Sequence, residues 1–283
     1  MKAPTPGTHF SLWRSEHLFN IDFAGYKLLH HDFPRHFHDH YVIELVLSGA
    51  DCFYCDGRNY TASHDQLILI NPGEVHTGST VADTPLHYFS LYPDRKALQQ
   101  VAEVLCLPFT AEHNFRKVLV DQSPLAGKLK LLFDSLVSHA EIVKQEELFF
   151  DCMSDLLQQR FAEEEEDKIA TQYDPRIKLL VDFIHSNFKE DISLKQMSGL
   201  VNLNPFHVVR LFKKNTGLSP YDYLLIIKTE HAKQLLRQGY KVQDAASRSG
   251  FYDASHLNRS LRRITGTSPK SYLSSQCQYC TSF

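Results

Sequence analysis

The segment RSLRRITGTSPKSYL, residues 259–273, repeats the segment RLFKKNTGLSPYDYL, residues 210–224, 49 positions further along the chain. Seven of the fifteen aligned positions are identical, and Lys213-Lys214 in the first copy align with Arg262-Arg263 in the second. In each copy a basic, half-apolar helix is predicted to end at a glycine, and Ser-Pro then opens another helix. Because an internal repeat defines the structural units of a chain, this one predicts a basic helical unit that is used twice.

Helix-start signals upstream of the first copy complete its unit. Ser193 with Gln196 three positions later predicts a capping box, and Asn204 followed by Pro205 opens a second helix that ends at Gly217. A helix, a tight turn and a second helix form the helix-turn-helix layout, whose second helix enters the major groove of DNA. The same layout recurs before the second copy. The C-terminal part of the chain is therefore predicted to be all-α, with two helix-turn-helix units.

The charge of the chain is divided between its two parts. Residues 1–171 carry a net charge of −11 and residues 172–283 carry +8, which gives −3 for the whole chain. Neutralisation of backbone phosphates supplies most non-specific affinity for nucleic acids. The basic part that contains the repeat is therefore expected to bind DNA, with its two units in successive major grooves about 34 Å apart.

The second unit, GFYDASHLNRSLRRITGTSPKSYL (residues 250–273), closely resembles the DNA-binding domain of the AraC/XylS family of transcription regulators. The resemblance extends over residues 176–273. It departs from the family pattern at Leu257 and Leu261, where aromatic residues are usual, and at Val209, where a polar residue that contacts bases is common. The resemblance implies a bacterial, sequence-specific regulator of transcription that is controlled by a small-molecule effector. An activator is expected, and the sequence itself leaves activation and repression open.

The resemblance also implies which side chains contact DNA. The residues expected in the major groove are Phe206, Val209 and Arg210 on the first recognition helix and Ala254, Ser255, Asn258 and Arg259 on the second. The residues expected to contact phosphates are Lys213, Lys214, Arg262 and Arg263. The alternative for Arg210 and Arg259 is that they brace their helices from inside the fold. His207 and His256, which also match in the repeat, are expected in the core.

The two copies are not expected to contribute equally to sequence recognition. Arg and Asn side chains make bidentate contacts with base edges, each contributing about 1–3 kcal/mol of discrimination. The second copy has Asn258 beside its arginine, whereas the first has Val209 at the matching position. Specificity is therefore expected to come mainly from the second unit.

The first third of the chain is typical of short β-strands. Its segments are rich in β-branched and aromatic residues and are bounded by Gly, Asp, Asn or Pro, and Asp56-Gly57 predicts a hairpin turn. The expected strands are residues 41–49, residues 51–63 on either side of that turn, residues 66–73 and residues 86–93. Regularly spaced short strands predict a small antiparallel barrel or sandwich.

Histidines are concentrated in this β-rich segment, where eight of the sixteen lie between His30 and His87. The motif HDHYVIE places His38, His40 and Glu44 on one face of a strand, and PGEVH adds His76 from a later strand. This set resembles the cupin barrel, in which such side chains hold a divalent metal. The match departs at Asp65, which replaces a usual glycine, and PGEVH is one residue shorter than the metal-binding version.

Regulators of this family commonly bind a small effector in a cupin barrel without metal. We therefore expect His38, His40, Glu44 and His76 to line an effector site, and we predict no metal and no cofactor. Metal ligation and a structural histidine cluster are the alternatives. Two Cys-x2-Cys pairs, at Cys52 and Cys277, are interpreted as reduced structural thiols rather than as a shared zinc site.

Helical periodicity replaces the strand pattern after Pro93. A helix starting at Ser123 is expected to align Leu125, Leu129, Leu132, Leu136 and Val143 on one face. A second helix starting at Gln145 is expected to align Leu148, Cys152, Leu156 and Phe161. Such a pair of helices either covers the barrel or forms a dimer seam.

The predicted fold class is α+β multidomain, with a cupin-like barrel and helical hairpin followed by an all-α domain. The predicted boundaries are 1–95 for the sensor barrel, 96–162 for a helical coupling segment, 163–174 for an acidic linker and 175–276 for the twin helix-turn-helix domain. The predicted function is a non-enzymatic, effector-controlled transcription regulator. The alternatives are a metal-dependent cupin enzyme, an oxygenase or isomerase, with an attached basic domain, and a non-specific architectural DNA-binding protein.

The expected partners are double-stranded promoter DNA, a small effector and RNA polymerase. A homodimer is possible. No apolar run approaches the roughly 20 residues that span a bilayer, and the N-terminus lacks the apolar core of a secretory signal. A cytoplasmic location without membrane contact is therefore expected.

Overall fold

The computed structural model describes residues 9–30, 32–81, 84–109, 113–121, 124–160, 174–270 and 272–273. The chain forms two compact units. We call the first the β-rich unit; it comprises Met1–Asp32, His38–Glu164 and Ser275–Phe283. We call the second the helical unit; it comprises Phe33–Phe37 and Glu165–Ser274. The predicted acidic linker up to residue 173, together with Ser123, Phe161 and Cys277, lies outside the described residues.

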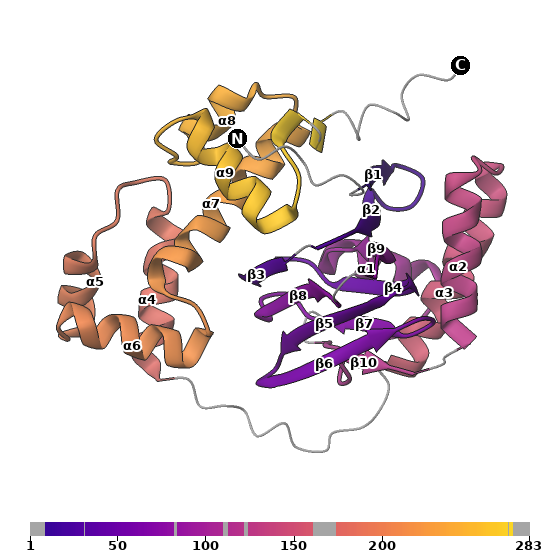
Figure 1. Cartoon of the computed structure of the whole chain (residues 1–283), viewed down its shortest axis with the longest axis horizontal. Helices are drawn as coiled ribbons and strands as arrows, with labels where there is room; N and C mark the ends of the chain where they lie inside the picture. Colours follow the sequence, from indigo (N-terminus) through magenta and orange to yellow (C-terminus); the bar gives the residue numbers. More distant parts are fainter. Residues whose placement is uncertain are drawn as a thin grey trace. The chain divides into compact units, whose positions relative to one another are not determined.

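Two antiparallel sheets form the framework of the β-rich unit (Figure 1). The six-stranded sheet has the order β1-β2-β9-β4-β7-β10, and the four-stranded sheet has the order β3-β8-β5-β6. Most residues of β3 belong to the segment Phe33–Phe37, which is counted with the helical unit. The strands are β1 (His9–Ser15), β2 (Ile21–Leu28), β3 (Asp32–His36), β4 (Val42–Ser48), β5 (Ala50–Cys55), β6 (Arg58–Ser63), β7 (Leu67–Ile70), β8 (His76–Thr80), β9 (Leu86–Tyr92) and β10 (Leu119–Val120). The predicted antiparallel barrel or sandwich is thus confirmed.

The strands expected from the sequence are present as β4, β5, β6, β7 and β9, and the predicted hairpin turn joins β5 to β6. Asp56 and Gly57 both have positive φ, at 46° and 78°. Two consecutive positive φ values are those of a type I′ turn, which suits the twist of the flanking strands. The strands β1, β2, β3 and β8 are additional to those expected.

One face of the six-stranded sheet packs against three helices. Directly paired residues share a face of a sheet. Two such pairs are Ile43 with Leu91 and Leu45 with Phe89. All four side chains belong to one buried apolar core with residues of α1 (Arg95–Val104), α2 (Pro124–Val137) and α3 (Ile142–Arg160). The helices therefore cover this face of the sheet. The predicted stripe of α2, which consists of Leu125, Leu129, Leu132 and Leu136, is buried in the shared core.

Val143 was predicted on the same stripe, and this prediction is wrong. Helix α2 ends at Val137, and α3 begins at Ile142. Between them His139 has a positive φ of 54°, which interrupts the helix and changes the direction of the following residues. The side chain of Val143 is 74% exposed.

The helices of the helical unit begin and end close to the predicted residues. Its helices are α4 (Pro175–Asn187), α5 (Leu194–Val201), α6 (Pro205–Thr216), α7 (Pro220–Arg237), α8 (Val242–Arg248) and α9 (Ala254–Thr265). The capping box is present: Ser193 accepts from the backbone N–H of Gln196, and the Gln196 side chain accepts from the backbone N–H of Ser193. The recognition helices α6 and α9 both end at a glycine in the left-handed region.

Helix α7 joins the two helix-turn-helix units. Near its start, Leu224 belongs to the core that contains Val208 and Phe212 of α6. Further along, the Thr229 hydroxyl hydrogen-bonds to Ser260 of α9 at 2.9 Å. The helix has 18 residues and is therefore about 27 Å long at 1.5 Å per residue. A continuous helix of this length fixes the separation of the two units.

Candidate DNA-binding surface and effector site

Helix α6 presents an aromatic and basic surface to solvent. Its Asn204 cap accepts from the backbone N–H of His207 at 2.9 Å, which fixes where the helix begins. Phe206 is 67% exposed, and the Arg210 guanidinium lies 5.7 Å from the centre of its ring. Lys213 and Lys214 are exposed one turn further on. The predicted contact residues of this helix thus form one solvent-facing group, with the exception of Val209.

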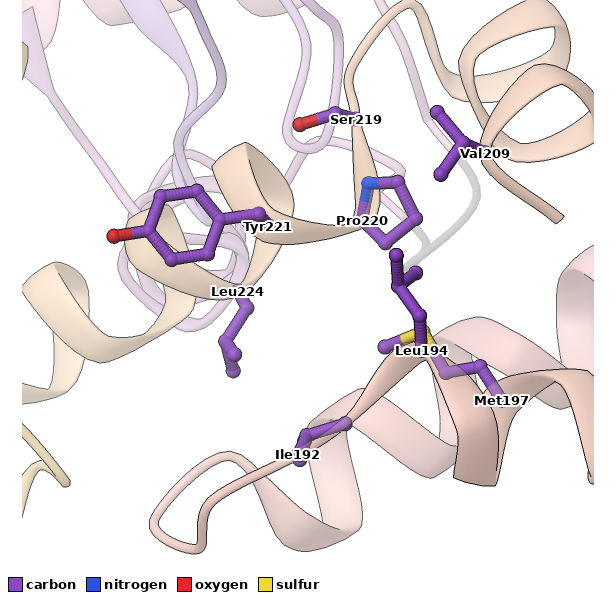
Figure 2. A pocket seen from close by; sticks show the side chains of 8 residues that line it. All are labelled: Ile192, Leu194, Met197, Val209, Ser219, Pro220, Tyr221 and Leu224. Carbon is purple, nitrogen blue, oxygen red and sulfur yellow. The ribbon is translucent and has the colours of Figure 1, made fainter. Parts of the chain in front are cut away.

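Val209 is half-buried and lines a cleft formed by α5, α6 and α7. Figure 2 shows the eight lining residues, which are Ile192, Leu194, Met197, Val209, Ser219, Pro220, Tyr221 and Leu224. The cleft has a volume of about 210 Å³ and is mainly apolar. An apolar side chain suits a cleft wall, so Val209 is explained by packing within the helical unit. This position favours the predicted DNA contact of Val209 less than the exposed position of Arg210 favours its own.

Helix α9 presents the matching surface of the second unit. Ser255, Arg259 and Arg262 are exposed, whereas Ala254 and Asn258 are half-buried. The Nε of Arg262 donates to the Oδ1 of Asn258 at 3.2 Å. This bond orients the Asn258 amide and leaves its NH2 group to donate elsewhere.

Arg263 differs from the other predicted phosphate ligands, because its guanidinium donates to Asp222 of α7 at 3.1 Å. This pair ties the end of α9 to the start of α7. Arg210 and Arg259 are both exposed, so neither braces its helix from inside the fold. Their contacts with DNA remain predictions.

The two matched histidines do not share the core position expected of them. His207 is exposed, and its Nδ1 is 2.9 Å from the amide nitrogen of Asn204 at the helix cap. That histidine was wrongly assigned to the core, because its position in the first turn of α6 faces solvent. His256 is half-buried with its ring edge-on to Phe251 at 5.2 Å, and burial lowers its pKa.

Gly250 positions the second helix-turn-helix unit against the first. Its φ is +72°, and a Cβ built at this residue would lie 2.6 Å from the carbonyl oxygen of Lys189. Its own carbonyl oxygen accepts from Lys228 Nζ of α7 at 2.6 Å. Only glycine allows this backbone contact, which accounts physically for the Gly-Phe that opens the second unit.

In the β-rich unit, three of the four predicted effector-site residues form an imidazole cluster. The His38 ring centre is 4.9 Å from that of His40 and 5.3 Å from that of His76. The His40 ring meets Tyr92 edge-on at 5.3 Å. His76 is held by its Nδ1, which donates to the carbonyl of Glu74 at 2.9 Å.

Glu44 lies on the face of the six-stranded sheet opposite the helices. It pairs with Ser90, whose hydroxyl donates to Glu44 Oε2 at 3.1 Å. Burial raises the pKa of Glu44 well above its ordinary value, repulsion by Asp51 adds to this, and the Ser90 hydrogen bond opposes it. Neither Ser90 nor Asp51 was named from the sequence. The alternation in LHYFSLYP could have revealed Ser90, because it places Tyr88, Ser90 and Tyr92 on one face of the strand.

The His, His, Glu and His set is not assembled as a four-ligand metal centre. Among the described residues, no group of three or more potential ligands with donor atoms within 4.8 Å of one another contains Glu44. Glu44 thus does not complete a metal site with two or more of these histidines. Polar lining of an effector site is compatible with this arrangement.

A sensor barrel and twin helix-turn-helix units define a ligand-binding transcription regulator. Residues 22–164 match the family described as AraC-like ligand binding domain, and residues 197–275 match a helix-turn-helix domain. The chain therefore belongs to the AraC family of DNA-binding transcription regulators, with an N-terminal ligand-binding domain, as the sequence predicted. The helices in the described ranges lack the length and apolar character needed to cross a membrane.

Named relatives match most of the chain. It is 27% identical over 242 residues to the uncharacterized HTH-type transcriptional regulator YbfI of Bacillus subtilis, covering 84% of this chain and 86% of that protein. It is 27% identical over 247 residues to the HTH-type transcriptional activator RhaS of Klebsiella pneumoniae, again covering 84% and 86%.

Solved structures share the two-domain fold. ToxT from Vibrio cholerae O395 has a TM-score of 0.53 at 11% identity, covering 96% of this chain and 98% of that one. ToxT of strain SCE256 bound to unsaturated fatty acid has a TM-score of 0.50 at 14% identity, covering 98% and 99%. At such identities the likeness shows the fold alone.

Proposed function

We propose that the chain recognises promoter DNA through α6 and α9 and is controlled by an effector bound among His38, His40, Glu44 and His76. The observation that supports the DNA-contacting residues is the matched exposure of Arg210 and Arg259, each followed by an exposed basic residue three positions later. Two equivalent positively charged helix faces suit two successive segments of one DNA backbone.

Base contacts are assigned to Arg210, Ser255, Asn258 and Arg259, and phosphate contacts to Lys213, Lys214 and Arg262. Phe206 lies beside Arg210 and is assigned an apolar contact with a thymine methyl group or sugar. Ala254 and Arg263 have lesser roles, because the first is small and half-buried and the second is paired with Asp222.

Selection of binding sites from random DNA, followed by shift assays, tests this assignment. We expect Arg259→Ala to lower affinity for the selected site by about tenfold to a hundredfold, which corresponds to about 1–3 kcal/mol, and to alter non-specific affinity much less. Lys178→Ala, which removes an exposed charge from α4, is the matched control. Equal losses of affinity on selected and random DNA would refute a base-contacting role and favour the architectural alternative.

We further propose that a second copy of the chain packs on the exposed apolar residues of the helical hairpin. Leu131, Val137, Ile142 and Val143 are each at least half exposed on α2 and α3. Sedimentation velocity should show a dimer that Val143→Asp converts to a monomer, while Lys144→Asp at the neighbouring exposed position leaves it intact. A wild-type monomer at all accessible concentrations would contradict this proposal.

RNA polymerase is proposed as a further partner, with the bacterial cytoplasm as the site of action. Support comes from the name of the RhaS relative, a transcriptional activator. We also propose that the chain is not an enzyme, since Glu44 does not complete a metal site with two or more of the histidines, which disfavours cupin metal chemistry. Transcription in vitro with purified RNA polymerase, with and without the chain, tests directly whether the chain acts on the polymerase.

A further inference from the structure

Two buried carboxyl groups face the inside of the β-rich unit. Glu44 on β4 is 8% exposed and Asp51 on β5 is 7% exposed. Asp51 Oδ1 accepts from the backbone N–H of Ser79 at 3.0 Å, and Glu44 Oε2 accepts from Ser90. Glu44 Oε1 has no hydrogen-bond partner among the described residues. An unpaired buried carboxyl oxygen is unfavourable, so we expect this atom to form a hydrogen bond with a group from outside the chain.

Tyrosine side chains lie on the same face of the six-stranded sheet as Glu44. Tyr26 pairs with Tyr88, their rings stack at 4.6 Å, and Tyr88 pairs in turn with Val46, two residues from Glu44. Tyr92 lies two residues beyond Ser90 on the same strand face. Burial raises the pKa of Tyr88 far above its ordinary value, so its ring stays a neutral phenol. Neutral aromatic faces attract cations.

Among the described residues, the buried polar side chains of the β-rich unit include the acidic Asp22, Glu44 and Asp51 and the histidines His40 and His76, but neither lysine nor arginine. Arg14 approaches Asp22 at 3.9 Å from a position that is 42% exposed, at the margin of the sheet. A bound anion would raise the pKa of Glu44 and Asp51 still further, and a neutral polyol carries no charge that would lower either pKa. A bound cation would lower both and stabilise the ionised carboxylates.

We propose that the effector is a small organic cation, whose ammonium group donates to Glu44 Oε1 and lies against the tyrosine faces. An ammonium group has several N–H donors, and its positive charge favours the ionised form of a neighbouring carboxyl group. The hydrogen bond that the ionised carboxylate then accepts is strengthened by charge. This inference rests on the proposed effector site and names the chemical class that Glu44, Asp51 and their tyrosines select.

Three probes that differ only in their head group test the proposal on the full chain. These are 2-phenylethylamine, 2-phenylethanol and phenylacetate, each titrated by calorimetry near neutral pH. We expect saturable binding of the amine, at least tenfold weaker binding of the alcohol and none of the acid. Equal or tighter binding of the alcohol or the acid, or no saturable binding of the amine, would overturn the proposal.

Variants identify the site. Glu44→Gln removes the charge with little change of shape and should weaken binding of 2-phenylethylamine at least tenfold, and Asp51→Asn should weaken it to a smaller extent. Asp56→Asn, at the exposed hairpin turn, is the control and should bind as the wild type does. Unchanged amine affinity in Glu44→Gln, with a native circular dichroism spectrum, would refute the assignment.

DNA binding by the same preparations separates this inference from the proposed function. A chain that selects promoter DNA but binds no amine refutes the cationic effector and leaves the DNA-contacting residues standing. A chain that binds the amine through Glu44 but does not distinguish selected from random DNA refutes the proposed base contacts and supports the effector class.

Discussion

Replacement of Gly250 by alanine should destabilise the helical unit more than the same replacement at Gly239. A Cβ at this residue would lie 2.6 Å from the carbonyl oxygen of Lys189 and 2.9 Å from its carbonyl carbon. The positive φ of +72° alone costs about 1–2 kcal/mol for a residue with a Cβ. Overpacking against backbone atoms adds about 1–3 kcal/mol. The expected loss is therefore about 2–5 kcal/mol of unfolding free energy.

Gly239→Ala is the matched control, because it separates backbone strain from steric overlap. Gly239 also has a positive φ, +86°, but nothing lies within 4 Å of the position that a Cβ would take there. It should therefore lose only the strain of about 1–2 kcal/mol. Urea unfolding of both full-length variants, followed by far-ultraviolet circular dichroism, measures the difference. If Gly250→Ala is no less stable than Gly239→Ala, the close contact with Lys189 does not constrain the fold.

Charge and hydrogen bonding lead to two further predictions. Burial raises the pKa of Asp51 to about 7, and the unfolded state releases that proton nearer pH 4, so the β-rich unit should lose stability as pH rises between these values. Asp51→Asn should flatten this slope in thermal melts, and an unchanged slope would contradict the assignment. Asn204→Ala removes the cap that accepts from His207 and should lower stability by about 1 kcal/mol, whereas no change in urea unfolding would show that the cap is dispensable.

The helical unit could be predicted from the sequence because its signals are local. Ser193 with Gln196, Asn204 with Pro205, and the closing Gly217 each specify a helix end through contacts a few residues apart. The residues expected to face DNA on α6 and α9 were given by the resemblance to the AraC/XylS family rather than by these local signals. His207 was misplaced because exposure in the first turn depends on how the helix packs, which neighbouring apolar residues do not indicate.

The β-rich unit was less predictable because its contacts are non-local. Strands β1 and β2 have partners that their own sequences do not specify, and β2 contains Gly25, which weakens a strand signal. The Glu44 and Asp51 pair joins two sheets, so no local motif contains it. The helix break at His139 was missed because its left-handed backbone is adopted by a residue that carries no strong turn signal.

The central claim is that two linked helix-turn-helix units contact DNA in successive major grooves. Methylation interference on a selected site measures this directly, because it reports guanine positions in the major groove whose modification blocks binding. The account predicts two clusters of interference about one helical turn apart, with the cluster assigned to α9 lost in Arg259→Ala. A single cluster in the wild type, or two clusters that Arg259→Ala leaves unchanged, would contradict it.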